Sequence, residues 1–180
     1  TWQRMQSQIV DANLSLPVEI DLYAIGEHWQ VRYRQHPGTQ VRVTAGGRLL
    51  TVYHAGDDES DCREALRRWL ARCAREHLGV RAQRLGADAG FSYRRLQIRG
   101  QKSRWGSCSS NGTLSLNYKL LFLKPELVRY LLVHELAHTR VLDHSTRFWK
   151  LVARHEPRWR EFDKELGEAW RDVPAWVELK

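Results

Sequence analysis

Apolar side chains occupy every second position in four short segments of the first third of the chain, which is the period of β-strands with one buried face. The alternating residues are Val18, Ile20 and Leu22, then Trp29, Val31 and Tyr33, then Val41 and Val43, and finally Leu50 and Val52. Glycine or proline separates these segments, as is typical of turns. The pattern predicts an antiparallel β-meander in an N-terminal subdomain, residues 1–56.

The spacing of apolar residues then becomes helical. Polar residues at 57–60 suit a helix N-cap, and they precede an apolar helix face formed by Leu66, Trp69, Leu70 and Cys73. We expect this helix to run to about His77 and to end at Gly79, with a short second helix at 82–85.

Strand patterns return after residue 90. We expect a strand at 91–98 and a hairpin that pairs 102–108 with 113–118, because Asn111-Gly112 between them is a strong hairpin signal. Three helices should follow, at 125–140, 145–154 and 157–169, the first with proline at its first turn. The predicted fold class is α+β, with residues 57–180 forming the core that follows the meander.

Composition narrows the function classes without choosing among them. The 180 residues are 42% hydrophobic and 28% charged, which excludes collagen-like and disordered chains. The longest apolar run, at 127–133, is too short for a membrane span and is interrupted by Arg129. Residues 1–10 lack a signal pattern, and the three cysteines are too few and scattered for a disulfide framework. We therefore expect a cytoplasmic protein.

The positive charge is concentrated in one segment. The formal net charge is +8, and residues 91–125 contain seven basic side chains and no acidic one. This favours an anionic partner, and we expect weak, sequence-independent binding of nucleic acid through Arg94, Arg95, Arg99, Lys102 and Arg104. The alternative is that acidic residues of the last helix, Glu161, Asp163 and Glu165, neutralise these side chains.

The expected 125–140 helix contains His134-Glu135-Leu136-Ala137-His138, an H-E-x-x-H motif. Residues four apart share a helix face, so both imidazoles can bind one metal ion, with Glu135 beside that face. The helix is apolar nearly all round, which indicates burial. Buried histidines and a glutamate need hydrogen bonds, charge pairing or a metal to compensate for lost hydration.

A catalytic zinc needs a third protein ligand and one open position. His144 is the first candidate, because it lies just past the expected helix end, where the chain can fold back. The alternatives for the third ligand are His155, Glu161 and Glu165.

Three segments together resemble the YgjP-like metallopeptidase family, a relative of the SprT-like and WLM-type zinc proteases. They are GQKSRWGSCSSNGTLSLNYKLL from Gly100, VHELAH from Val133 and DHSTRFW from Asp143. The resemblance implies a zincin-like catalytic core, one Zn²⁺ per chain held by His134, His138 and His144, and Glu135 as general base. Val141 stands where metzincins carry a glycine, which argues against a secreted metzincin.

The expected function is a zinc metallopeptidase in which Glu135 takes a proton from a zinc-activated water that attacks the peptide bond. Arg104, Asn117 and Tyr118 are candidate contacts to substrate or to the oxyanion, and 113–118 is a candidate edge strand for aligning a peptide. Asp143 either supports a ligand imidazole or caps a helix. The alternatives are a zinc-dependent hydrolase of nucleotide phosphoanhydrides and a nucleic-acid-binding module with a structural metal. The sequence gives no natural substrate and no oligomeric state.

Overall fold

The computed structural model of the chain describes residues 15–56 and 58–179. The predictions that concern residues 1–10 and the cap at residue 57 lie outside this part. Residue contacts divide the described chain into two compact units. Unit 1 comprises residues 15–22, 26–69 without residue 57, and 173–179, and unit 2 comprises 23–25 and 70–172. The first long helix contributes residues to both units. The expected domain boundary at residues 56/57 stays a prediction.

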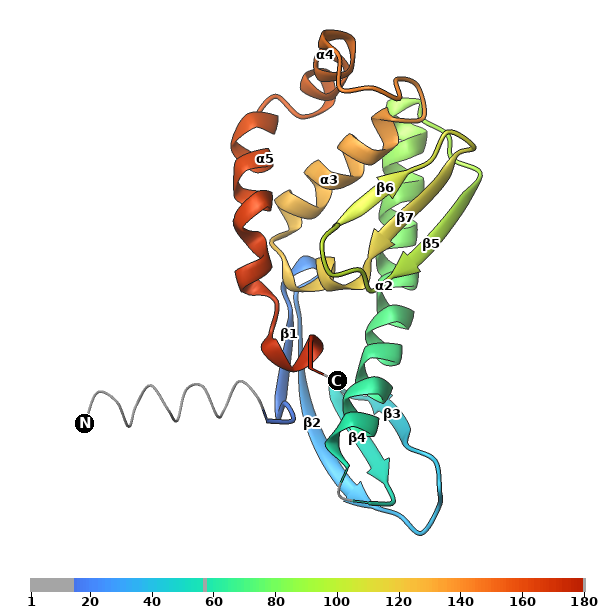
Figure 1. The fold of residues 1–180 in the computed structure, drawn as a ribbon, viewed down its shortest axis with the longest axis vertical. Coiled ribbons are helices and arrows are strands. Elements are labelled where there is room, and N and C mark those ends of the chain that lie inside the picture. Colours follow the sequence, from blue (N-terminus) through green and yellow to red (C-terminus); the bar gives the residue numbers. More distant parts are fainter. Residues whose placement is uncertain (1–14, 57, 180) are drawn as a thin grey trace, which may run out of the picture. The chain divides into compact units, whose positions relative to one another are not determined.

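Unit 1 contains a four-stranded sheet formed by the alternating segments of the sequence. Its strands are β1 (Glu19–Leu22), β2 (Glu27–Gln35), β3 (Arg42–Gly46) and β4 (Leu49–His54), in the order β1-β2-β4-β3 (Figure 1). Its buried side chains are Ile20, Leu22, Val31, Leu50 and Val52. These belong to the alternating set, whereas Val18 of the same set is 69% exposed and Trp29, Tyr33, Val41 and Val43 are half-buried. The pattern therefore identified part of the predicted face as the core of the sheet.

The prediction of an antiparallel meander is wrong for one pairing, because β2 and β4 run parallel. The two-residue turn between β3 and β4 has positive φ at Gly47 (56°) and Arg48 (62°), as hairpin turns with the native strand twist require. This hairpin places β4 between β2 and β3. Alternation reports which side chains a strand buries but not which strand lies beside it.

The first long helix, α2 (Glu59–Ala89), continues beyond the predicted end at Gly79 and includes the predicted second helix. Gly79 is a place of close approach instead, because a Cβ there would lie 3.2 Å from Leu96 Cδ2. The helix ends at Gly90, whose φ is +69°. The Phe91 amide donates to Gly86 O at 2.8 Å and the Gly90 amide to Ala87 O at 3.4 Å, which is the Schellman pattern of helix ends.

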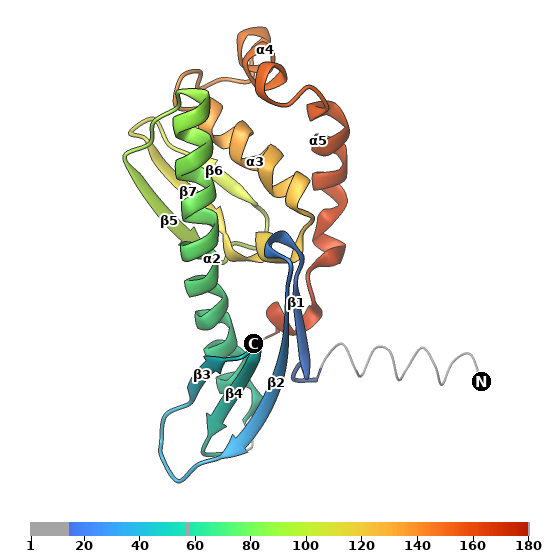
Figure 2. The ribbon, with the colours of Figure 1, turned by 180° about the vertical axis from the view of Figure 1, so that it is seen from behind.

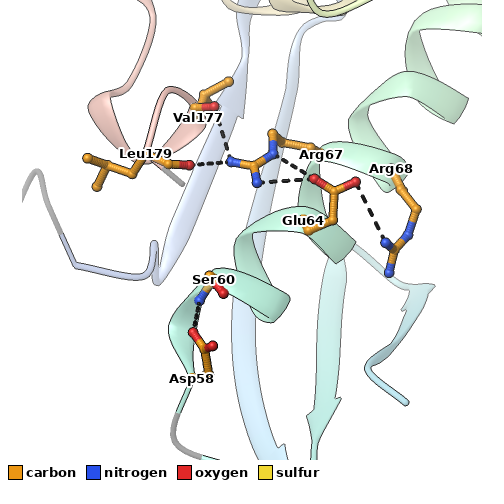
Figure 3. A network of polar contacts seen from close by, with 7 residues as sticks. All are labelled: Asp58, Ser60, Glu64, Arg67, Arg68, Val177 and Leu179. Atoms are coloured by element: carbon orange, nitrogen blue, oxygen red, sulfur yellow. Dashed lines mark hydrogen bonds and ion pairs between the residues drawn. The ribbon is translucent and has the colours of Figure 1, made fainter.

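Within unit 1, the start of α2 holds the last described residues of the chain (Figure 3). Arg67 Nη1 donates to Leu179 O at 2.6 Å and to Val177 O at 3.4 Å, while its Nε donates to Glu64 Oε2. The Ser60 amide donates to Asp58 Oδ1 at 2.8 Å, in the first turn of the helix. One arginine therefore joins residues more than a hundred positions apart in the sequence.

Unit 2 contains a second, three-stranded sheet. Its strands are β5 (Arg95–Arg99), β6 (Gly106–Cys108) and β7 (Thr113–Asn117), in the order β5-β7-β6. The predicted hairpin is confirmed, since β6 and β7 are antiparallel, whereas β5 and β7 are parallel. The strands β5 and β6 begin later than predicted. The candidate edge strand 113–118 is corrected as well, because β7 lies in the middle of the sheet and β6 at one edge.

The three predicted later helices are confirmed, with small changes at their ends. They are α3 (Pro125–Ala137), α4 (Thr146–His155) and α5 (Trp159–Glu168). Short 3-10 segments are η1 (Tyr23–Ile25), η2 (Tyr118–Phe122), η3 (Ala169–Asp172) and η4 (Ala175–Val177). In unit 2, α3 packs against α4, α5 and β6. The view from behind shows α4 beyond the C-terminal end of α3 (Figure 2). The fold class is α+β, as predicted.

Two further findings concern the whole described chain. None of its helices is long and apolar enough to cross a membrane. The cysteines Cys62, Cys73 and Cys108 are all free thiols.

Candidate metal centre

The C-terminal end of α3 brings the histidines of the H-E-x-x-H motif to the surface of the core. His134 lies in the last turn, and His138 is the C-cap residue, with φ −63° and ψ −18°. The amides of Arg140 and Val141 both donate to Ala137 O at 3.0 Å. These bonds tighten the helix end and turn the chain, so that the connection to α4 can return toward the two histidines.

The connection brings His144 to the pair. The candidate ligand atoms of His134, His138 and His144 all lie within 4.8 Å of one another, and the two Nε2 atoms of His134 and His144 are 3.1 Å apart. A tetrahedral zinc with bonds of about 2.0–2.1 Å places its ligand nitrogens about 3.3 Å apart. Three imidazoles that converge in this way fit a zinc ion in both donor type and spacing.

Hydrogen bonds fix the orientation of two of these rings. His138 Nδ1–H donates to Val141 O at 3.0 Å, which leaves the Nε2 lone pair for a metal. The Tyr130 hydroxyl donates to Asp163 Oδ1 at 2.6 Å and lies 3.4 Å from His134 Nδ1. Since the Tyr130 proton is given to Asp163, its oxygen accepts from His134 Nδ1–H, and again Nε2 is left free. Such outer partners usually orient metal-binding histidines.

Neither Tyr130 nor Asp163 was predicted to support the metal ligands. Tyr130 precedes His134 by one helical repeat of four residues, so its position on the same face of α3 was a usable signal. Asp163 lies on α5, 33 residues from Tyr130. Only the packing of α5 against α3 brings the two together.

The surroundings of His134 and His138 favour the neutral imidazole, the form that binds a metal. Burial, followed by the neighbouring His138 and His144, lowers the pKa of His134 to about 3. Burial is also the largest cause of the lowered pKa of His138.

An aromatic wall from α4 and α5 closes the other side of the cluster. The His138 ring stacks on Phe148 with centroids 4.4 Å apart, and the His144 ring on Trp149 at 5.6 Å. Trp149 in turn stacks on Trp159 at 4.2 Å. The pair Phe148-Trp149 ends the DHSTRFW segment, and its packing on the histidines explains why aromatic residues follow His144 so closely.

Glu135 lies on the side of α3 that faces β6. A Cβ added to Gly106 would be 3.0 Å from Glu135 Cγ and 3.2 Å from Oε1, so the side chain packs directly on the β6 backbone. Burial raises the pKa of Glu135 to about 7, opposed by the positive charge of Arg104 and by a hydrogen bond from the Cys108 backbone. The residue Glu135 is 6% exposed. Its carboxyl group can exchange a proton near neutral pH.

The three candidate substrate contacts have different surroundings. The Asn117 amide donates to Gln101 O at 2.8 Å and to Arg104 O at 2.9 Å, so both of its protons are used to hold the loop before β6. Tyr118 is buried, and its ring packs on Gly100. Arg104 is exposed and lies close enough to Glu135 to affect its pKa. The roles of Arg104, Asn117 and Tyr118 as substrate contacts stay predictions.

The alternative third ligands lie elsewhere. His155 packs edge-on against Phe91 at 5.1 Å, Glu161 pairs with Arg158, and Glu165 pairs with Lys124 at 2.6 Å. Asp143 accepts a hydrogen bond from the Ser145 amide at 3.4 Å, at the start of α4. Asp143 thus stabilises the turn before α4, whose N-cap residue is Ser145 and has no side-chain cap hydrogen bond.

The basic segment 91–125 is less cationic at the surface than its composition indicated. Lys119 is 1% exposed, with Nζ donating to Gln101 O at 3.1 Å. Lys124 is ion-paired with Glu165. The expectation that acids of the last helix neutralise the basic side chains of 94–104 is not confirmed, because among the described residues Glu161 pairs with Arg158, Glu165 with Lys124, and Asp163 accepts from Tyr130.

Trp105, which precedes β6, has a structural environment. Its ring stacks on Trp170 at 3.8 Å, and its Nε1 donates to Leu166 O at 3.1 Å. These contacts anchor the loop that positions β6 and Arg104.

Comparisons with known proteins complete the description of the site. A family model described as "YgjP-like, metallopeptidase domain" matches residues 2–169. No curated protein matches the chain significantly.

Two solved structures are similar to about half of the chain. One is the metallopeptidase zymogen abylysin of Pyrococcus abyssi, 26% identical, with a TM-score of 0.48 over 52% of this chain and 95% of that one. The other is the metallopeptidase zymogen jannalysin of Methanocaldococcus jannaschii, 18% identical, with a TM-score of 0.46 over 52% of this chain and 96% of that one.

Proposed function

The chain belongs to the YgjP-like metallopeptidase family, and we propose that it is a zinc-dependent peptidase with Glu135 as its general base. The observation that carries the proposal is the convergence of three imidazoles, whose candidate ligand atoms lie within 4.8 Å of one another, beside a buried carboxyl group on α3. His134, His138 and His144 would hold one Zn²⁺ through their Nε2 atoms. When bound, zinc acts as a Lewis acid and makes water a strong nucleophile at neutral pH.

Glu135 supplies the proton transfer that peptide hydrolysis needs. Its carboxylate takes a proton from the attacking water as the new C–O bond forms at the scissile carbonyl. It then gives the proton to the amide nitrogen, which leaves as an amine when the C–N bond breaks. A hydrogen bond from the Cys108 backbone and the packing on Gly106 of β6 hold this carboxylate in place.

The edge strand β6 supports a peptide as the substrate. An extended peptide can add to a free sheet edge through backbone hydrogen bonds, and the β6 edge lies next to Glu135. Arg104, exposed and close enough to Glu135 to lower its pKa, would donate to a carbonyl or carboxylate of that peptide.

Hydrolysis of a phosphoanhydride is less well supported. A triphosphate needs cations that face the metal ligands, whereas the rings packed on these histidines are Tyr130, Phe148 and Trp149. A purely structural metal would leave the buried Glu135 without a role.

The test uses the full zinc-loaded chain with casein and with ATP as parallel substrates. Casein should be cleaved and ATP should not. Glu135→Gln should retain the metal and lose about 10²–10⁴-fold in rate, because the amide has nearly the same size but cannot take the proton. Glu161→Gln, a surface change of the same chemistry, is the control and should behave as the parent.

Two results would overturn the proposal. Hydrolysis of ATP without hydrolysis of casein would reject the peptidase. Casein cleavage by Glu135→Gln within a few-fold of the parent would reject Glu135 as the base.

A further inference from the structure

The outer face of α4 carries a concentration of positive charge that the peptidase chemistry does not use. Arg147, Lys150 and Arg154 of α4, together with Arg140 from the preceding connection, line a hollow of about 480 Å³. Its other lining residues are Val141, Thr146 and Leu151. Four cationic side chains thus surround one hollow that has no acidic lining residue. We call these four residues the α4 basic surface.

These charges are not neutralised inside the protein. Within residues 15–56 and 58–179, no ion pair joins any of the four side chains to a carboxylate. Arg140 is held by a hydrogen bond to Gly90 O and lies over the Phe91 ring at 5.1 Å. The nearest acid on the same connection is Asp143, whose pKa is lowered first by hydrogen bonds with Ser145 and only then by Arg147.

The spacing on the helix holds the charges in a row. Arg147, Lys150 and Arg154 are three and four residues apart, so they share a face and extend over about 10 Å at 1.5 Å per residue. The opposite face of α4 buries Phe148 and Val152, which fixes the helix on the core. Because duplex DNA carries one charge per about 1.7 Å of its axis, such a row faces several phosphates at once.

A second hollow continues the positive surface within unit 2. It measures about 440 Å³, and its lining includes Arg81, Arg84 and His155, one acid, Asp88, and Arg129, which is ion-paired with Glu156. Its lining residue His155 directly follows Arg154 of the first hollow, at the C-terminal end of α4. A surface of this extent suits a polyanion better than a single acidic side chain.

We propose that the α4 basic surface binds the phosphate backbone of double-stranded nucleic acid without reading its sequence. The hollow has no aromatic lining residue on which the bases of a single strand could stack. Its polar lining consists of arginine, lysine and one threonine, and arginine and lysine supply most protein contacts to the phosphate backbone. Phosphate contacts by these side chains therefore provide the affinity. The location differs from the one expected from the sequence, which was the 94–104 segment.

The experiment compares two triple variants that remove the same number of charges. Arg147→Gln/Lys150→Gln/Arg154→Gln changes the α4 basic surface, and Arg94→Gln/Arg95→Gln/Arg99→Gln changes the segment expected from the sequence. Fluorescence anisotropy with a labelled duplex of mixed sequence gives the affinity of the full chain between about 50 and 200 mM salt. Thermal unfolding of each variant checks that it folds.

Four phosphate contacts predict a log–log salt slope near −3.6, or about 150-fold weaker binding for a fourfold rise in salt. The α4 variant should retain one contact and a slope near −0.9, whereas the 94–99 variant should keep the parent slope. Equal losses in both variants would show that only net charge matters and overturn the proposal. Unchanged binding in the α4 variant, or stronger competition by polyglutamate than by unlabelled duplex, would also overturn it.

Discussion

The three clustered histidines differ in how firmly each ring is held. His138 is fixed by the Val141 carbonyl, and His134 by Tyr130. His144 is exposed, and its ring packs on Trp149. Among the described residues, its only hydrogen-bond contact is the one with His134 Nε2 at 3.1 Å. The site therefore combines two oriented rings on α3 with a third that the α3–α4 connection supplies.

Changing His144 to alanine should abolish stoichiometric zinc binding. Two imidazoles leave a zinc ion without the third protein ligand that a catalytic site requires. The parent should contain about one zinc per chain, measured by mass spectrometry of the purified protein. His54→Ala removes a histidine whose Nδ1 contacts only its own turn, at Gly56 O, and should keep the parent metal content. A full metal content in His144→Ala would contradict its role as a ligand.

Changing Tyr130 to phenylalanine should weaken zinc binding by about 10–100-fold, the usual effect of losing an outer partner of a ligand. The phenyl ring keeps the packing against Phe162 but no longer accepts from His134 Nδ1. Competition with a chromogenic chelator measures the affinity. Tyr53→Phe, on β4 in unit 1, is the matched control. An unchanged affinity in Tyr130→Phe would show that the 3.4 Å contact does not orient the ring.

Among the contacts between secondary-structure elements, the one between α3 and β6 positions the side chain of Glu135. A helix and a strand can approach this closely only where one of them lacks a side chain, and Gly106 provides that position. The carboxyl group of Glu135 fills the space that a Cβ would occupy. The glycine of the RWGSC segment is therefore part of the positioning of the proposed base.

Changing Gly106 to alanine should lower kcat/KM by at least about tenfold, since displacement of a catalytic group by 1 Å can cost about 10²-fold. The new Cβ would lie 3.0 Å from Glu135 Cγ, and one of them must move. The metal content should not change, because the contacts that orient the histidines come from Tyr130, Val141, Phe148 and Trp149 and not from β6. Gly46→Ala is the control, as a Cβ there meets no atom within 4 Å. Parent activity in Gly106→Ala would show that β6 does not position Glu135.

In the whole molecule, contacts between residues distant in sequence hold each unit together. In unit 1, Arg67 joins the first turns of α2 to the carbonyls of Val177 and Leu179 (Figure 3). Its side chain is 18% exposed, whereas that of neighbouring Arg68 is 56% exposed and pairs only with Glu64. Two adjacent arginines thus differ in how much they contribute to the fold.

Arg67→Ala should lower the free energy of unfolding by about 1–3 kcal/mol, because two backbone acceptors lose a charged donor. Arg68→Ala should change it by less than about 0.5 kcal/mol, as is usual for exposed positions. Urea denaturation followed by circular dichroism measures both. Equal effects of the two substitutions would show that the contact with the C-terminal segment contributes little stability.

Local patterns predicted the elements of this protein well where one short segment contained the whole signal. The turn at Asn111-Gly112 predicted the β6–β7 hairpin, and Pro125 with the apolar run after it predicted α3. The predicted helix end at Gly79 was wrong, because a glycine that ends a helix and a glycine that allows a neighbouring strand to approach cannot be distinguished in the sequence. The packing of Leu96 on Gly79 is a property of the folded chain.

The sequence by itself determined the side chains of the candidate site on α3, since the four-residue spacing of His134 and His138 follows from helix geometry alone. It also determined which strand positions are buried, because alternation is a property of the extended chain. Only the tertiary structure decided which strands pair, that Asn117 holds a loop and that Asp163 reaches Tyr130. It also revealed a second concentration of positive charge, on α4, in addition to the basic side chains of the 94–104 segment, which are exposed as well. These features depend on contacts between residues far apart in the chain, which arise from packing and leave no periodic signal in the sequence.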